Sequence, residues 1–243
     1  MLSLSKLFKY KYLPHFMVLL LLLLLLVTGA VPGYITGKWQ WKEPPPVTNL
    51  NLIKKIRSQG LTLPGWKTVE QVEQQIGEHK WSLQVLQQES TQSKAILLLL
   101  PQNGPKDQPE IEWTDVNGWG KGRWGKWDIA QERSARFVVK KSSPGGNTET
   151  TVEAQFFRVS TNQDTFAVLQ WYALPQSGYY TPFRWFLADQ LAQWQKQRQP
   201  WVAVSILVPM EPLGQVETTW PLAQSIGETV QSTLMTGVFN TTK

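Results

Sequence analysis

The sequence predicts an α+β protein in which a single N-terminal transmembrane helix precedes one exported domain, an antiparallel sheet covered by two long helices. Three observations lead to this prediction. Eight consecutive leucines lie near the N-terminus, in a segment without Asp, Glu, Lys or Arg. In the middle of the chain, short segments with alternating apolar and polar residues are separated by turn residues. Two segments in the last third repeat apolar residues at helical spacing.

The leucine-rich segment is the first element to justify. A run of this length exceeds the roughly 20 residues that cross a bilayer, so residues 13–35 are expected to be a transmembrane anchor in contact with membrane lipid. Lys6, Lys9 and Lys11 precede the run, which indicates a cytoplasmic tail at 1–12 and a C-terminal domain on the exported, periplasmic side. The alternative is a signal peptide cleaved near residues 28–30, which would also export the rest.

Composition narrows the function classes. Cys is absent, which excludes disulfides and thiolate catalysis. The net charge is +6, but four lysines flank the leucine-rich segment, and the remaining balance does not suggest a nucleic-acid partner. We therefore expect no nucleic acid among the partners, and neither a metal nor a cofactor.

The exported domain is expected at residues 51–243, after a Trp/Pro-rich linker at 36–50. It opens with a short helix that ends by Gly60, and a capping pattern predicts a second helix over 68–77. Alternation and turn residues then predict a series of antiparallel strands, at 81–86, 94–100, 136–140, 152–159 and 165–172.

The two long helices and one further strand complete the prediction. Pro182 opens a helix to Gln197, expected to be covered through the apolar face Phe183, Phe186, Leu187, Leu191 and Trp194. The continuously apolar run 201–208 predicts a central strand. The last helix is expected over 221–236, and both helices are expected on one face of the sheet.

A glycine-rich loop at 118–127 is the candidate binding site. Tryptophans alternate there with basic residues, a combination that stacks on sugars or binds anionic groups. In the alternative interpretation, one or two of the tryptophans cap the core. The candidate residues are Trp119, Lys121, Arg123, Trp124, Lys126 and Trp127.

No catalytic residue is predicted. His79 is the one histidine beyond the leucine-rich region, and its place at a helix end favours an exposed surface side chain. Glu110 and Glu112 form a carboxylate pair, but no acid partner across a cleft is evident. The protein is therefore not expected to be an enzyme.

Several short motifs resemble the exosortase system-associated proteins, and the cyanobacterial kind most. They are Leu63-Pro64-Gly65-Trp66, the Pro109 to Gly118-Trp119 spacing, Leu169-Gln170-Trp171-Tyr172 before a helix, and the strand Val202–Val208. The resemblance implies a non-enzymatic accessory of a multi-spanning membrane exosortase, in a protein-sorting system linked to exopolysaccharide in the cell envelope.

The sequence departs from that family at one motif. Many members carry His-x-Pro-x-x-Cys, whereas Asp107 and Glu112 stand here in place of the histidine and cysteine. The departure favours a non-catalytic role. The alternative hypothesis is an envelope glycan-binding or glycan-assembly factor that holds polysaccharide with the Trp-rich basic loop.

Overall fold

The computed structural model describes residues 13–29, 44–110, 113, 116–117, 127–143, 146–161 and 163–240. The chain divides into two compact units, Met1–Pro44 and Pro45–Lys243, and each is described by itself.

The first unit contains helix α1 (Leu13–Gly29), which is 17 residues long. Phe16 to Val27 are all exposed on it. At 1.5 Å per residue its length is about 25 Å, less than the roughly 30 Å of a bilayer's hydrocarbon core. Among the residues described, no helix is long and apolar enough to cross a membrane. The predicted single-pass transmembrane anchor, and the membrane localisation derived from it, are therefore corrected.

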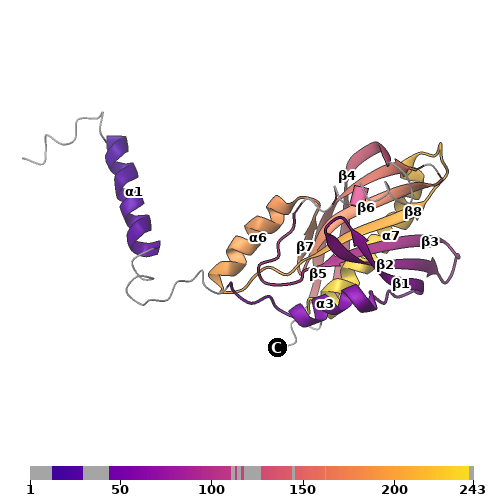
Figure 1. Ribbon diagram of the computed structural model, residues 1–243, viewed down its shortest axis with the longest axis horizontal. Coiled ribbons are helices and arrows are strands. Elements are labelled where there is room, and N and C mark those ends of the chain that lie inside the picture. The colour runs from indigo at the N-terminus through magenta and orange to yellow at the C-terminus, as the bar shows by residue number, and fades with distance from the viewer. Residues whose placement is uncertain are drawn as a thin grey trace, which may run out of the picture. The chain divides into compact units, whose positions relative to one another are not determined.

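The second unit is built on one eight-stranded sheet (Figure 1). Neighbouring strands follow the order β1-β2-β3-β8-β6-β7-β5-β4, with an additional β5–β6 pairing. The pairings between these strands are antiparallel except for the parallel bridge between Val152 and Gly178 that joins β5 and β7. The strands are β1 (Trp66–Ile76), β2 (His79–Gln88), β3 (Lys94–Pro101), β4 (Asp128–Ser143), β5 (Gly146–Ser160), β6 (Thr165–Leu174), β7 (Ser177–Tyr179) and β8 (Val202–Pro209).

The centre of the sheet is covered on both faces. Every residue of β6 is buried, and β8 is buried from Val202 to Val208, as its continuous apolar sequence predicts. Because side chains alternate along a strand, β6 contributes Leu169 and Trp171 to one core cluster and Val168 and Tyr172 to another. The domain thus has two hydrophobic layers, one on each side of the sheet.

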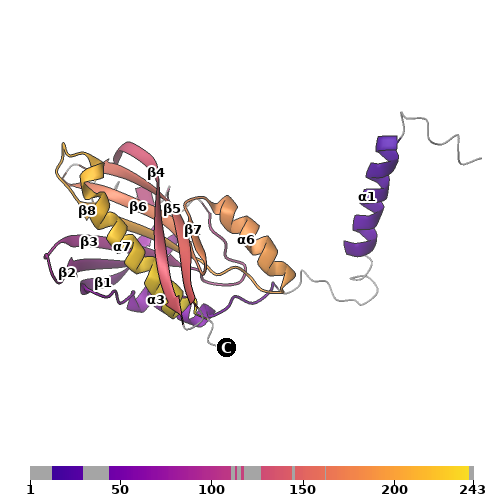
Figure 2. The ribbon, with the colours of Figure 1, turned by 180° about the vertical axis from the view of Figure 1, so that it is seen from behind.

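The first cluster is covered by helix α3 (Leu50–Gln59) and helix α7 (Trp220–Thr233), which ends in the π-helical turn η3 (Leu234–Val238). A short 3-10 turn, η2 (Val216–Thr219), precedes α7. Figure 2 shows α7 lying across the strands. The close approach depends on Gly227, where an added Cβ would lie 3.1 Å from the side chains of Leu169 and Phe137.

Helix α6 (Pro182–Trp194) belongs to the other layer, because its buried Trp185 packs in the second cluster. The prediction that two long helices cover one face is therefore wrong, and so is the α+β class drawn from it. The fold is mostly sheet, with β4 and β5 reaching 16 and 15 residues. The helix predicted over 68–77 is instead strand β1, because its backbone pairs with β2 along its whole length.

Candidate binding site

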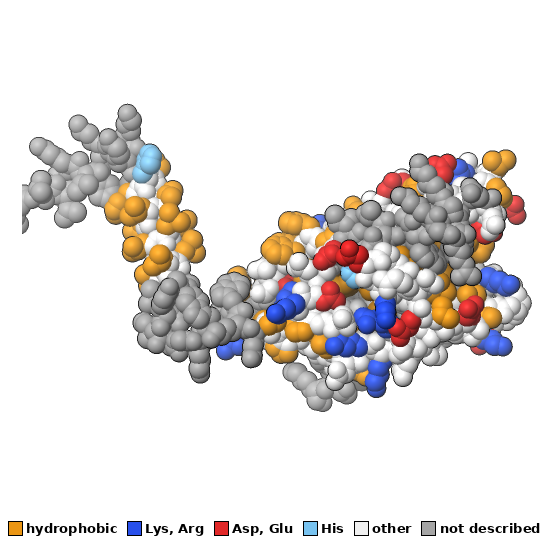
Figure 3. All heavy atoms as spheres, viewed as in Figure 1, with side chains coloured by type: hydrophobic (Ala, Val, Ile, Leu, Met, Phe, Trp, Pro, Cys, Tyr) orange, Lys and Arg blue, Asp and Glu red, His pale blue; other side chains and the backbone are white. Residues whose placement is uncertain are grey.

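Helix α6 turns its apolar face outward, opposite to the prediction. The five residues of this face are all exposed, whereas Trp185 and Asp189 on the other side of the helix are 2% and 1% exposed. Figure 3 shows hydrophobic side chains gathered along the edge of the domain that α6 forms. The exposed fractions are 64% for Phe183, 47% for Phe186, 43% for Leu187, 61% for Leu191 and 85% for Trp194.

Asp189 explains why the helix has this orientation. Its carboxylate accepts hydrogen bonds from Arg198 Nε at 2.8 Å, Gln199 N at 2.9 Å and Gln193 Nε2 at 2.7 Å. The side chains of Asp189 and Arg198 are only 2% and 11% exposed. Rotating the apolar face inward would break this buried ion pair and leave Arg198 largely buried without its counter-charge.

Arg198 extends the same network to other segments. Its Nη1 donates to Pro105 O at 2.5 Å, and its backbone N–H donates to Pro46 O at 2.9 Å. The guanidinium also lies over the Trp185 ring, 5.6 Å from its centroid, and the indole of Trp185 donates to Gln199 O at 3.1 Å. Helix α6 is therefore fixed to the chain before β8 and to the start of the domain.

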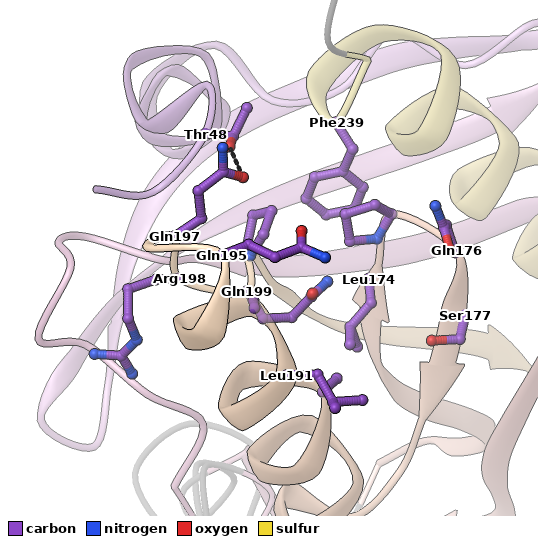
Figure 4. Close-up of a pocket in the computed structure, with 14 residues that line it drawn as sticks. Thr48, Leu174, Gln176, Ser177, Leu191, Gln195, Gln197, Arg198, Gln199 and Phe239 are labelled. Atoms are coloured by element: carbon purple, nitrogen blue, oxygen red, sulfur yellow. Dashed lines mark hydrogen bonds between the residues drawn. The ribbon is translucent and has the colours of Figure 1, made fainter. Parts of the chain in front are cut away.

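A groove of about 450 Å³ lies beside the second half of α6 (Figure 4). Its walls are the helix, the turn between β6 and β7, and the segment 197–200, and Thr48 and Phe239 also line it. This volume is within the range of small-ligand and peptide pockets. Leu191 belongs both to the groove and to the exposed stripe of α6.

The groove has amide-rich, uncharged chemistry. Figure 4 shows the Gln195 and Gln199 amides pointing into the space, with Gln176 and Ser177 on the opposite wall. The Arg198 guanidinium points away from it and is paired with Asp189. No carboxylate is among the lining residues, and Leu174, Leu191 and Phe239 supply apolar surface. A neutral ligand rich in hydrogen-bonding groups suits this lining.

The Trp-rich loop lies almost wholly outside the described residues. Trp119, Lys121, Arg123, Trp124 and Lys126 belong to that part. Trp127 is described and is 6% exposed, packed in the second core cluster. Its ring is therefore not available at the surface, which fits the interpretation that one of these tryptophans caps the core.

The candidate catalytic residues are not brought together. His79 begins strand β2 and is half-buried, Glu110 is exposed, and Glu112 lies outside the described part. No cluster of His, Asp and Glu that could hold a metal occurs where the structure is described. Asp189 is the one buried carboxylate among the described side chains, and its three hydrogen bonds serve the ion pair.

Residues of the family-like motifs are mainly core residues. Leu63 and Trp66 pack with α3, β2 and β3 in the first cluster, and Trp171 and Tyr172 are fully buried on opposite faces of β6. Trp171 lies beside α7 rather than α6, because its indole N–H donates to Gln231 Oε1 at 2.9 Å. These motif residues therefore contribute to the packing of the domain core.

Sequence reasoning missed the groove. Its signal is the run of glutamines at alternate positions, 195, 197 and 199, which follows the end of α6 and precedes β8. That run resembles an ordinary polar helix end, and only the fold places it opposite the β6–β7 turn.

Comparisons with known proteins add little. No protein-family model and no curated protein matches the chain. A crystal structure of human STARD10 matches over 82% of this chain and 82% of its own, with 12% identity and a TM-score of 0.20. That similarity is too distant to support an inference.

Proposed function

We propose that this protein is a non-catalytic accessory of a cyanobacterial exosortase protein-sorting system and that it binds an extended, uncharged segment of a protein partner. The observation that carries the proposal is the amide-lined groove beside α6. The exosortase system is proposed from the resemblance of the motifs, and the groove is the candidate site for binding the partner's segment.

The groove suits a peptide main chain. A glutamine side chain offers two N–H donors and one carbonyl acceptor, which complement the carbonyl and N–H groups of a peptide bond. Gln195 and Gln199 have no protein hydrogen bond from their side-chain amides within the described residues, so their donors and acceptors face the groove. Leu174 and Leu191 add apolar contacts for small side chains.

A sugar ligand suits the groove less well. Sugar sites commonly use the face of an exposed aromatic ring as a platform. Phe239 is the one aromatic residue of the lining, and it is 6% exposed. This observation favours peptide over polysaccharide as the ligand of the groove.

The proposal is tested by co-purifying the full chain with a tagged multi-spanning exosortase. The test variant is Gln195→Glu/Gln199→Glu, which places two carboxylates in the neutral groove. We expect the captured exosortase to fall at least about tenfold, since unpaired charges are costly to desolvate at an interface. Folding should be unchanged, because substitutions on the exposed or half-buried surface usually have small effects.

The matched control is Gln163→Glu, an exposed glutamine in the turn before β6. It lies at the opposite end of that strand from the groove, roughly 30 Å away. It should capture as much partner as the wild type. Equal capture by the groove variant would refute the groove as the binding site. Retention on exopolysaccharide with no protein partner would refute the accessory role in favour of glycan binding.

A further inference from the structure

We infer that the outer face of α6 lies on an anionic lipid surface. This inference goes beyond the proposed function. Of the exposed apolar residues on which it rests, only Leu191 also lines the groove. It concerns contact of one surface helix with lipid headgroups and requires no membrane-spanning segment.

The first argument is the extent of the apolar stripe along one side of α6. The exposed residues are spaced by three, one, four and three positions, which places them on one side of a helix with about 3.6 residues per turn. Phe183 and Trp194 mark the two ends, so the stripe runs the length of α6. An exposed apolar surface of this kind, interrupted by the single polar residue Gln190, marks a contact site in a folded protein.

The second argument is the charge on the same helix. Arg184 is exposed near its start and Lys196 is exposed just after its end. The single acidic residue, Asp189, is buried and paired with Arg198. The surface that α6 presents therefore carries only positive charge beside its apolar stripe. Exposed Arg and Lys side chains beside an apolar surface are attracted to the anionic headgroups of a bilayer.

The third argument distinguishes lipid from a protein partner. Protein interfaces favour aromatic residues and Arg but are depleted in Lys, and their cores are shaped as pockets that receive side chains. The apolar stripe of α6 is the convex side of a single helix, and the groove opens beside it along Leu191. Trp, Phe and Leu flanked by Arg and Lys are the composition of interfacial helices.

The test uses a fluorophore placed inside the stripe. Gln190 is exposed between Phe186 and Trp194 along the helix, and the chain has no cysteine, so Gln190→Cys can be labelled at one position with an environment-sensitive dye. The full chain is combined with phosphatidylcholine vesicles, with or without phosphatidylglycerol. Helix α1 is present in every sample, and the label reports on α6 alone.

We expect the label at position 190 to be quenched by nitroxide lipids and protected about threefold or more from iodide when phosphatidylglycerol is present. The matched control is Leu213→Cys, which replaces an isolated apolar residue that is 93% exposed. Its label should stay accessible to iodide. Phe186→Gln/Leu187→Gln/Trp194→Gln should abolish the protection at position 190, and Arg184→Glu/Lys196→Glu should weaken it.

Three results would overturn the inference. A label that is as accessible on vesicles as in solution would show that α6 does not touch lipid. Protection without vesicles would identify a second copy as the occupant, and protection only with exosortase would identify a protein. The groove test measures captured exosortase and the lipid test measures protection of the label at position 190, so a failed groove test leaves this inference standing and the reverse is also true.

Discussion

Replacing Asp189 with Asn tests what orients α6. The substitution keeps the side-chain shape but removes the charge and turns an amide NH₂ toward groups that donate hydrogen bonds. Asp189 and Arg198 are 2% and 11% exposed, so Arg198 is left largely buried without its counter-charge. Removing one partner of such a pair costs about 3–5 kcal/mol. For a domain of this size the melting temperature should fall by roughly 6–20 °C.

The assay is urea unfolding followed by tryptophan fluorescence, with Glu217→Gln as the control. Glu217 pairs with Arg133 at 2.6 Å, but these side chains are 58% and 33% exposed, so the control should cost at most about 1 kcal/mol. Adding Arg198→Met to Asp189→Asn should recover stability by removing the unpaired cation. A loss no larger than that of the control would refute the idea that the buried pair fixes α6.

Two further predictions concern packing around Trp171, and urea unfolding measures both. Gly178→Ala should destabilise the domain by about 1–3 kcal/mol, because the new Cβ would lie 2.7 Å from Val152 Cγ1 and 2.8 Å from Trp171 Cδ1. Val152→Ala should rescue part of the loss, and additive effects would contradict the proposed clash. Trp171→Phe should cost about 1–3 kcal/mol, because the buried Gln231 Oε1 loses its 2.9 Å hydrogen bond. A change below roughly 0.5 kcal/mol would show that the hydrogen bond is unimportant.

The strands of the sheet were the most predictable part of the fold. Residues 201–208 are apolar without interruption, which is typical of a strand covered on both faces, and β8 lies between β3 and β6. The short helix ending at Gly60 was also correct, since Gly60 has a φ of 68°, a conformation suited to glycine. Periodicity and turn residues are enough to predict a strand or a helix where a segment has one clear pattern.

Strand β1 shows where periodicity is insufficient. Val69, Val72 and Ile76 recur at helical spacing, yet the segment pairs with β2 from Trp66 to Ile76. Val69 and Val72 are 57% and 38% exposed, so their spacing does not reflect burial. The decisive interaction is the hairpin with β2, which a local pattern does not contain.

The orientation of α6 was the more instructive error. An apolar stripe shows that a helix has two different sides, but it does not show which side the domain covers. Here Trp185 and Asp189 occupy the inner side because Arg198, nine positions later, supplies a buried partner. The groove was equally hidden, because Gln199 and Gln176 line one groove only when β6 and β7 turn back beside α6.

The central claim is that α6 exposes Trp194 and buries Trp185, and hydroxyl-radical footprinting of the folded chain tests it most directly. Mass spectrometry compares oxidation of the two indoles, which lie on one helix and have 85% and 2% exposure. The structure predicts that Trp194 reacts at least about tenfold faster than Trp185, because solvent reaches only the outer side of a packed helix. Equal rates, or faster oxidation of Trp185, would contradict the outward apolar face and the binding surfaces derived from it.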